Sequence, residues 1–357
     1  MFKKYGHIAF FAFGFLFDVL TLGQIDNFWN LSQHFVVICL LSVFLLAEVF
    51  FIFDKKFLHA VFSKDNVKFF WPKAIHFLLG ILYSAYFIFF FKSSGDLSHY
   101  IFLLVMVFLL IVNEFDLLGR EGFLFRFVLW VVAVHCFFYY AVPIFMGKTG
   151  DWPFLISTFL SFCFFVLLVR ALDFFKIAKN FIFSKIILPS LLVELCFMFA
   201  YFFNGIPPLP FVTTHLGLYQ RIKVSKVDGQ KNYQLDFRKK SWEFWKKSAT
   251  EISVQDDQLV VFFQLYMPEN FKQKVIVEWS QLQNRDRKFV WVVQDKIPLD
   301  AVGGREKGYR AYTVKKNYSI GRWRIRIRLP DSKVLKEKIF DISDKNLSES
   351  QQVSANY

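Results

Sequence analysis

The sequence predicts a membrane α-helical bundle of about seven transmembrane helices, followed by an all-β antiparallel sandwich. Two observations support this fold class. First, the 357-residue chain is 55% hydrophobic with 51 phenylalanines, and the apolar excess lies before residue 211. An ordinary soluble domain is at most about half apolar, so we expect this half in a bilayer. Second, the polar remainder consists of short β-branched and aromatic stretches separated by turn signals, which is typical of antiparallel strands.

Seven apolar stretches are candidates for membrane-spanning helices, which need about 20 mostly apolar residues. The first and the fourth of them are short. The first is not interpreted as a cleaved signal peptide, because it lacks a clear small-residue cleavage site and further spans follow it. The predicted spans are Ile8–Leu22, His34–Phe53, Ala74–Phe91, Ser98–Val112, Leu124–Phe145, Phe154–Leu172 and Ile186–Phe203.

Lysine and arginine in the short loops predict the orientation of these spans, because cytoplasmic loops carry the excess of positive charge. The loops on one side contain 13 of these residues, whereas the loops on the other side contain only Lys92 and Lys148. The N-terminus is therefore predicted in the cytoplasm and, after an odd number of spans, the polar half outside. In a bacterium with two membranes, this describes a multi-pass inner-membrane protein with a periplasmic C-terminal domain.

A proline-rich exit marks the boundary between the two halves. The prolines of Ile206–Pro208 end the last span and give a short, stiff connection. We divide the chain into a polytopic helical domain (1–205), a Pro-rich linker (206–214), an extracytoplasmic β-sandwich (215–343) and a polar tail (344–357) expected to be disordered. The predicted strands are Ile222–Val227, Tyr233–Phe237, Leu259–Met267, Val275–Trp279, Lys288–Val293, Tyr309–Lys315, Trp323–Leu329 and Val334–Ile342.

The positive charge of the chain is concentrated in its polar half. Lysine and arginine exceed the acidic residues by 3 before residue 211 and by 11 after it, which together give the net charge of +14. A basic domain indicates an anionic partner. Nucleic acid is scarce outside the cytoplasm, and no helix-turn-helix, zinc-finger or RRM signature is visible. We therefore expect the lipid bilayer, and an anionic lipid, a glycan or an envelope protein, as partners.

Residue types that carry catalysis or bind metals are scarce in the polar half. It contains one histidine, His215, no cysteine, and neither a GxSxG nor an HExxH motif. The four cysteines of the chain lie in apolar stretches, without CxxC or metal-ligand spacing. No nucleophile–base constellation is visible. We therefore expect no catalytic residue, no metal and no cofactor in this half.

A strand near the C-terminus alternates arginine with apolar residues, in the sequence GRWRIRIRLPD. Such a strand directs its apolar side chains to the core and its guanidinium groups to the opposite face. Carboxylates of neighbouring strands, such as Glu337 or Asp341, would offset the repulsion between these groups and leave a structural face. Alternatively the face binds an anion, because arginine matches phosphate and carboxylate bidentately. The anion- or glycan-binding hypothesis comprises Arg305, Tyr309, Arg310, Arg322, Arg324, Arg326 and Arg328.

A segment between two predicted strands combines tryptophan with lysine. In Arg238–Ser248, the residues Trp242 and Trp245 are flanked by Lys239 and Lys240. This combination suits a membrane interface, where the segment would rest on the outer leaflet. The alternative is a short helix that covers one edge of the sandwich.

Ionisable residues within the predicted spans are expensive in a membrane and are candidates for function. Glu194 lies near the middle of the last span and His135 near the middle of the fifth. If they meet, the pair could relay protons or bind a cation, or it could be one hydrogen bond between two helices. The full set in the spans is Asp18, Glu48, His76, His135 and Glu194.

The C-terminal half resembles a known family through a tryptophan after an apolar strand, a GGR–GYR–Y stretch, and a G-x-W-R strand followed by a turn. The matching residues are Gly303, Gly304, Arg305, Gly308, Tyr309, Arg310, Tyr312, Gly321, Trp323 and Arg324. This pattern resembles the C-terminal domain of unknown function 2914 of bacterial membrane proteins, which often follows a multi-span half with an IPP exit. The resemblance implies a bacterial inner-membrane protein and supplies no activity. Where the family often has glycine in the turn, this chain has PDSK.

Three functions follow from these observations. The first is a non-enzymatic membrane protein whose basic sandwich binds an anionic envelope component or an envelope protein. The second is a transporter or channel component, with Glu194 and His135 in the pathway. The third, weaker alternative is a membrane enzyme that acts on a lipid-linked substrate.

Overall fold

The computed structural model describes two compact units, Met1–Ser93 with Leu97–Pro210, and Ser94–Asp96 with Phe211–Tyr357. The division after Pro210 falls inside the predicted linker. The described residues are 15–16, 18–20, 22, 26–53, 65–115, 122–227, 230–239, 242–243, 245–249, 251–253, 258–285, 287–305, 307–331, 333–344 and 351–357.

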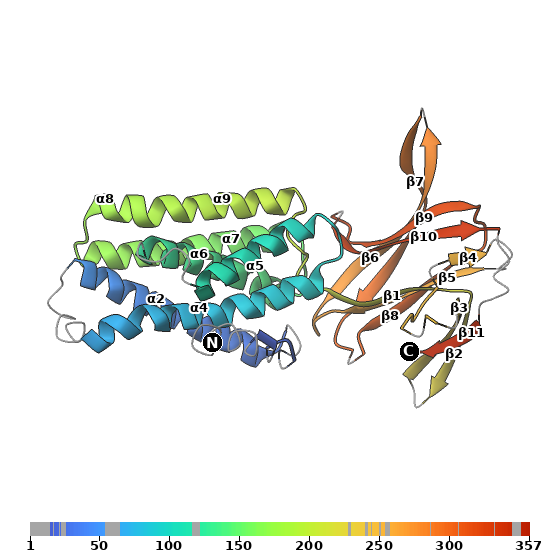
Figure 1. Cartoon of the computed structure of the whole chain (residues 1–357), viewed down its shortest axis with the longest axis horizontal. Helices are drawn as coiled ribbons and strands as arrows, with labels where there is room; N and C mark the ends of the chain where they lie inside the picture. The colour runs from blue at the N-terminus through green and yellow to red at the C-terminus, as the bar shows by residue number, and fades with distance from the viewer. Residues whose placement is uncertain are drawn as a thin grey trace. The chain divides into compact units, whose positions relative to one another are not determined.

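The first unit is helical, as the sequence predicts (Figure 1). Five stretches are long and apolar enough to cross a membrane, namely Phe28–Ile52, Trp71–Ser93, Gly122–Met146, Asp151–Phe174 and Lys179–Phe202, and the apolar helix at His99–Asn113 is shorter. The predicted span Ile8–Leu22 lies mostly outside the described residues, so seven spans stay a prediction. The helices are α2 (Phe28–Ile52), α4 (Asp65–Ser93), α5 (His99–Phe115), α6 (Gly122–Met146), α7 (Asp151–Phe174), α8 (Lys179–Ile182), the π-helical turn η1 (Phe183–Ile187) and α9 (Leu188–Phe202).

Helix α6 forms the core of the helical unit. It packs against α2, α4, α7 and α9, and 83% of its apolar window is buried, compared with 39% for α2 and 28% for α7. A helix that is apolar on every side is expected to be enclosed by other helices or by lipid. Polar side chains on α6 can therefore find partners only on the surrounding helices.

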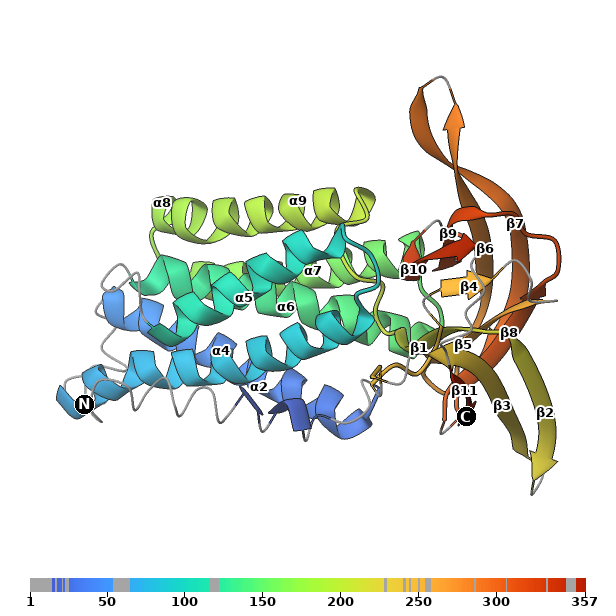
Figure 2. The same cartoon turned by 45° about the vertical axis from the view of Figure 1, so that its right-hand side comes forward.

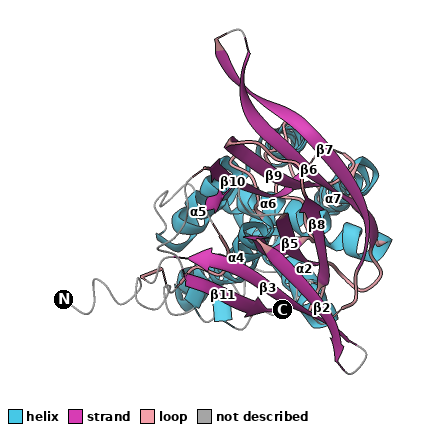
Figure 3. Ribbon diagram, turned by 90° about the vertical axis from the view of Figure 1, so that its right-hand side faces the viewer, coloured by secondary structure: helices cyan, strands magenta, loops and turns pink. Residues whose placement is uncertain are grey.

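The second unit is built from three β-sheets with the strand orders β1-β5-β8, β4-β10-β9-β6-β7 and β11-β3-β2 (Figure 3). The pairs are antiparallel except that the short strand β4 joins β10 in parallel. The strands are β1 (Val212–Tyr219), β2 (Arg221–Val227), β3 (Gln230–Lys239), β4 (Glu251–Ser253), β5 (Leu259–Tyr266), β6 (Lys272–Arg285), β7 (Lys288–Val302), β8 (Tyr309–Lys315), β9 (Gly321–Arg328), β10 (Val334–Ser343) and β11 (Gln351–Asn356).

One hydrophobic core joins residues from all three sheets. Trp279 of β6, Trp323 of β9 and Phe262 of β5 are buried in it, together with Leu235 of β3. Full burial of a large apolar side chain stabilises a fold by roughly 1.5–3 kcal/mol. The unit therefore has a core of its own, formed without a disulfide because all four cysteines lie in the helical unit.

The predicted disordered tail is wrong for its last residues. Gln351–Asn356 forms β11, which pairs antiparallel with β3, and Tyr357 exchanges backbone hydrogen bonds with Tyr233 at 2.9 and 3.0 Å. Val353, Ala355 and Tyr357 alternate and pack against the core. The segment was not predicted as a strand because the residues between these three are polar, which makes its composition resemble that of a disordered tail.

Strands β1 and β4 were not predicted, and other strand boundaries also differ from the prediction, including that of β6, which is longer than the predicted Val275–Trp279. β1 begins at Val212, inside the predicted linker, and the predicted strand Lys288–Val293 continues to Val302 as β7. β7 lies at the edge of its sheet. An edge strand tolerates Pro298, which lacks a backbone donor.

Candidate functional site

The arginine strand is β9, which lies between β10 and β6 in the five-stranded sheet. Its apolar residues Trp323, Ile325 and Ile327 are buried in the core, as the alternation predicts. The arginines therefore lie on the opposite face of the sheet. Each of them can reach the side chains of two neighbouring strands.

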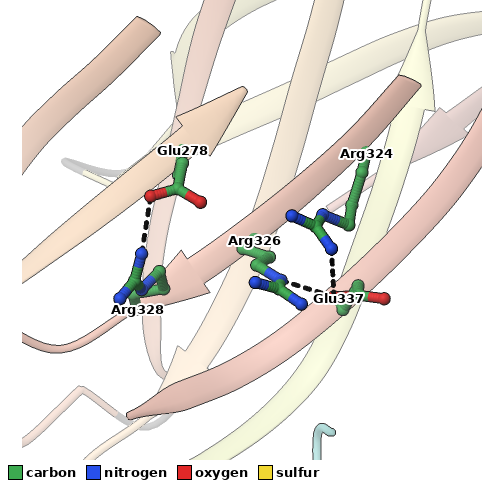
Figure 4. A network of polar contacts seen from close by, with 5 residues as sticks. All are labelled: Glu278, Arg324, Arg326, Arg328 and Glu337. Atoms are coloured by element: carbon green, nitrogen blue, oxygen red, sulfur yellow. Dashed lines mark hydrogen bonds and ion pairs between the residues drawn. The ribbon is translucent and has the colours of Figure 1, made fainter. Parts of the chain in front are cut away.

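Carboxylates from both neighbouring strands pair with the arginine row (Figure 4). Glu278 of β6 accepts a 2.6 Å bond from Arg328, through its Oε2 and the Nη1 of the arginine. On the other side, Glu337 of β10 lies 2.5 Å from Arg326 Nε and 3.9 Å from Arg324 Nη1. These five residues form a network, here called the arginine cluster, that ties β6, β9 and β10 together.

The arginine cluster is mostly screened from solvent. Glu278 is 2% exposed and Arg324 is 9% exposed. The guanidinium of Arg324 lies over the ring of Trp291 of β7 at 4.4 Å, a cation–π contact. Burial lowers the pKa of Arg324, and the charge of Arg326 lowers it further. Arginine nevertheless stays charged in proteins, so the cluster holds three cations and two carboxylates.

The fourth arginine of the row differs from the other three. The side chain of Arg322 is 58% exposed and lies 3.8 Å from Asp341. A pair this exposed contributes about 0–1 kcal/mol. The expected offset by Glu337 and Asp341 is confirmed, with Glu278 as a third carboxylate that the sequence reasoning missed. The arginine row thus offers an anion little unpaired guanidinium, apart from Arg322.

Two predicted site arginines, one in the loop before β8 and one in β8 itself, lie over tyrosine rings. Arg305 lies over Tyr309 at 5.6 Å, and Arg310 lies over Tyr233 of β3 at 5.3 Å. Burial raises the pKa of Tyr309. β8 belongs to the three-stranded sheet with β1 and β5, whereas β9 belongs to the five-stranded sheet. Arg305 and Arg310 therefore do not continue the arginine row within one sheet.

Glycine is needed in this loop for steric reasons. A Cβ at Gly303 would lie 1.8 Å from the carbonyl oxygen of Pro268. Gly308 has φ +70°, a left-handed conformation that favours glycine. These contacts account for the GGR–GYR spacing through backbone geometry.

The two tryptophans of the tryptophan–lysine segment are exposed, whereas Glu243 between them is buried. Trp242 and Trp245 are both exposed, with ring centroids 5.5 Å apart. The described residues 242–243 and 245–249 form turns and bends, so the alternative of a short helix is wrong there. Lys239 ends β3, and Lys240 lies outside the described residues.

A polar cluster that the sequence reasoning missed lies around His215. His215 Nε2 is 2.7 Å from the hydroxyl of Tyr219, which also donates to the carbonyl of Lys247 at 2.9 Å. Tyr357 packs on the His215 ring at 4.6 Å. Burial, with the charges of Lys338 and Lys247, lowers the pKa of His215 to about 4. The ring is therefore neutral at pH 7 and acts as a hydrogen-bonding core residue.

The helical unit brings the two predicted mid-span residues together. His135 Nδ1 of α6 lies 2.8 Å from Glu194 Oε2 of α9. Both side chains are buried, and the ring of Phe197 covers the imidazole at a centroid distance of 4.0 Å. The sequence placed each residue near the middle of a span and gave no sign that they meet.

The other predicted ionisable residues of the spans also have partners. Glu48 of α2 accepts from Arg126 of α6, with Arg126 Nε at 3.2 Å. His76 Nδ1 lies 2.9 Å from the side-chain oxygen of Asn113. Asp18 accepts a hydrogen bond from Ser84.

Helices α2 and α6 are joined by two further polar contacts that the sequence reasoning missed. Trp130 donates to Ser42 at 3.2 Å, and His34 contacts the hydroxyl of Tyr140 at 2.7 Å. Residue numbers fall along α2 as they rise along α6, so the two helices run antiparallel. The signal in the sequence was polar residues at intervals along two apolar spans.

A family model described as a protein of unknown function (DUF2914) matches residues 272–342. The chain carries a C-terminal DUF2914 domain. The match runs from the start of β6 almost to the end of β10, and it contains all five residues of the arginine cluster. The DUF2914 segment therefore coincides with the part of the β unit in which three strands are tied together by charge.

No curated protein matches the chain. Among solved structures, an immunoglobulin-like protein from Pseudomonas aeruginosa is 14% identical over 34% of this chain and 97% of its own, with a TM-score of 0.20. A β-glucosidase from Listeria innocua in complex with glucose is 11% identical over 32% of this chain, with a TM-score of 0.20, and the match spans only 17% of that enzyme.

Proposed function

We propose that this chain is a bacterial inner-membrane protein whose basic periplasmic β domain binds an anionic component of the envelope, with lipid head groups as the favoured ligand. The observation that carries this proposal is a basic and apolar hairpin end outside the arginine cluster. Arg285, Arg287 and Lys288 are exposed at the end of the β6–β7 hairpin, next to Phe289, which is 73% exposed. We call these four residues the hairpin end.

The hairpin end extends beyond the rest of its sheet (Figures 1 and 2). β6 pairs with β9 only from Ile276 to Gln281, whereas it pairs with β7 as far as Arg285 and Lys288. At about 3.3 Å per residue, the four pairs beyond β9 extend the hairpin by roughly 13 Å. Its cations are thus presented away from the carboxylates of the arginine cluster.

Cations beside an exposed aromatic ring suit a lipid surface. Each lysine or arginine near an anionic bilayer contributes about 1 kcal/mol of attraction. An aromatic side chain adds apolar contact at the level of the head groups. Within the described residues, none of the three cations of the hairpin end forms an ion pair. The three cations are therefore available to bind an external anion.

Hydrogen–deuterium exchange of the full-length protein in lipid nanodiscs tests this function. We expect residues 282–291 to exchange more slowly in discs of anionic phosphatidylglycerol than in discs of zwitterionic phosphatidylcholine, and the difference to shrink at high salt. Replacing Arg285, Arg287 and Lys288 with glutamine should remove the difference.

The β2–β3 hairpin offers a matched control. Lys223, Lys226 and Lys231 are exposed there, and changing all three to glutamine removes the same charge from the same unit. The lipid effect on residues 282–291 should survive in this variant. Equal exchange in both kinds of disc, or equal loss of the effect in both variants, would contradict a lipid-binding role for the hairpin end.

A further inference from the structure

The contact between His135 and Glu194 has unused hydrogen-bonding capacity deep inside the helical unit. His135 is fully buried and Glu194 is 6% exposed. His135 Nδ1 and Glu194 Oε2 lie 2.8 Å apart, yet none of the four polar side-chain atoms of the two residues forms a hydrogen bond among the described residues. In an apolar surrounding each unpaired polar group costs several kcal/mol. A purely structural contact would be expected to satisfy at least one of these atoms with a hydrogen bond.

No other charge within the described bundle neutralises this pair. Arg126, the buried cation of α6, is paired with Glu48 of α2. Cys136 is the nearest titratable neighbour on α6 and is coupled electrostatically to Glu194. Other titratable groups on the elements around the pair include His34 of α2, Tyr83 and Tyr86 of α4, His99 of α5, Tyr139 and Tyr140 of α6, Asp151 of α7 and Tyr201 of α9.

Tyr201 links helix α9, which carries Glu194, to an exposed carboxylate at the start of α7. Tyr201 lies two turns after Glu194 on α9, about 10 Å along the helix axis, and its hydroxyl donates to Asp151 at 2.9 Å. Asp151 is exposed at the first residue of α7. Phe154 lies between, stacked on Tyr201 at 3.7 Å and edge-on to His135 at 6.2 Å. Two aromatic rings, those of Phe154 and Tyr201, thus lie between the pair and Asp151.

We propose that His135 and Glu194 form a proton-binding site within the membrane bundle. With one shared proton the pair is neutral overall, either as imidazolium with carboxylate or as imidazole with carboxylic acid. Release of that proton leaves a carboxylate beside a neutral ring. Ionisable residues in this position mark proton relays in membrane proteins. One carboxylate and one imidazole are too few ligands for a metal cation.

Nuclear magnetic resonance of the full-length protein with ¹⁵N-labelled histidine, in lipid nanodiscs, tests the site. The His135 signal is assigned by its loss in His135→Asn. The signal is recorded from about pH 5 to about pH 8, and we expect it to change within that range as the pair gains or loses its proton. Glu194→Gln should change the pH dependence of this signal, because the carboxylate that shares the proton is gone.

Glu48→Gln is the matched control, since it removes another buried carboxylate from the same bundle and should leave the His135 midpoint in place. If Glu194→Gln does not fold, the wild-type titration decides alone. A His135 signal that stays constant across the pH range overturns the proposal and makes the pair a fixed structural contact. A signal that responds to sodium against choline at constant pH also overturns it, in favour of a metal cation.

Discussion

Single carboxylates determine how the arginine cluster behaves. Glu337 pairs with both Arg324 and Arg326, and Glu278 pairs with Arg328. Removing one partner of a buried ion pair leaves an uncompensated charge, which is much more destabilising than the loss of an exposed pair. The two situations occur on the same strand here, at Arg328 and at Arg322.

We predict that Glu278→Gln lowers the free energy of unfolding of the β unit by about 2–3 kcal/mol, because the buried Glu278 no longer balances Arg328. Asp341→Asn removes the exposed partner of Arg322 and should cost less than about 0.5 kcal/mol. Thermal denaturation of the full-length protein, followed by tryptophan fluorescence, compares the two variants. If both variants melt at the same temperature as the wild type, the contact of Glu278 with Arg328 does not stabilise the β unit.

Alternation of arginine with apolar residues made β9 predictable, whereas the polar composition of the tail concealed β11. The arginine–isoleucine repeat indicated both the strand and its two faces, and Glu337 and Asp341 could be named as partners. Glu278 could not, because strand order is not written in local sequence. The contact between His135 and Glu194 was beyond sequence reasoning for the same reason, since it depends on which helices are neighbours.

We predict that deleting residues 344–357 destabilises the β unit, because β11 pairs with β3 and Tyr357 packs on His215 at 4.6 Å and on Phe262 at 5.1 Å. Amide exchange of β3 in the full-length protein should accelerate at least about tenfold, the change that a loss of 1.4 kcal/mol produces. Deleting only residues 345–350 and joining the ends with a Gly/Ser linker keeps β11 and should leave the exchange of β3 slow. Unchanged amide exchange of β3 after the full deletion would contradict this prediction and favour the disordered tail that the composition indicates.

At the scale of the whole molecule, each unit has its own core and its own charged network. The helical unit is organised around α6, which carries Arg126, His135 and Tyr140 to partners on α2 and α9. The β unit is organised around β9. The orientation of the chain in the membrane matters for both units, because it determines which compartment the hairpin end and Asp151 face.

The number of spans decides the side of the N-terminus, and the positive-inside rule decides the side of the β unit. α2, α4, α5, α6, α7 and the continuous stretch Lys179–Phe202 supply six apolar helices, and Ile8–Leu22 would be the seventh. α5 has 17 residues, about 26 Å of helix, which is near the thickness of a bilayer core. With seven spans the two ends of the chain lie on opposite sides, and with six they lie on the same side.

We predict seven spans, and two fusions in bacterial cells test them. A phosphatase reporter that is active only outside the cytoplasm should be active after Tyr357 and inactive when inserted after Ala178, between α7 and α8, where Arg170, Lys176 and Lys179 cluster. A fluorescent reporter that matures only in the cytoplasm should be bright at the N-terminus. A dark N-terminal fusion with an active C-terminal one would mean six spans and would remove Ile8–Leu22 as a crossing helix. An inactive reporter after Tyr357 would place the β unit in the cytoplasm and reverse the side of the membrane that Asp151 faces.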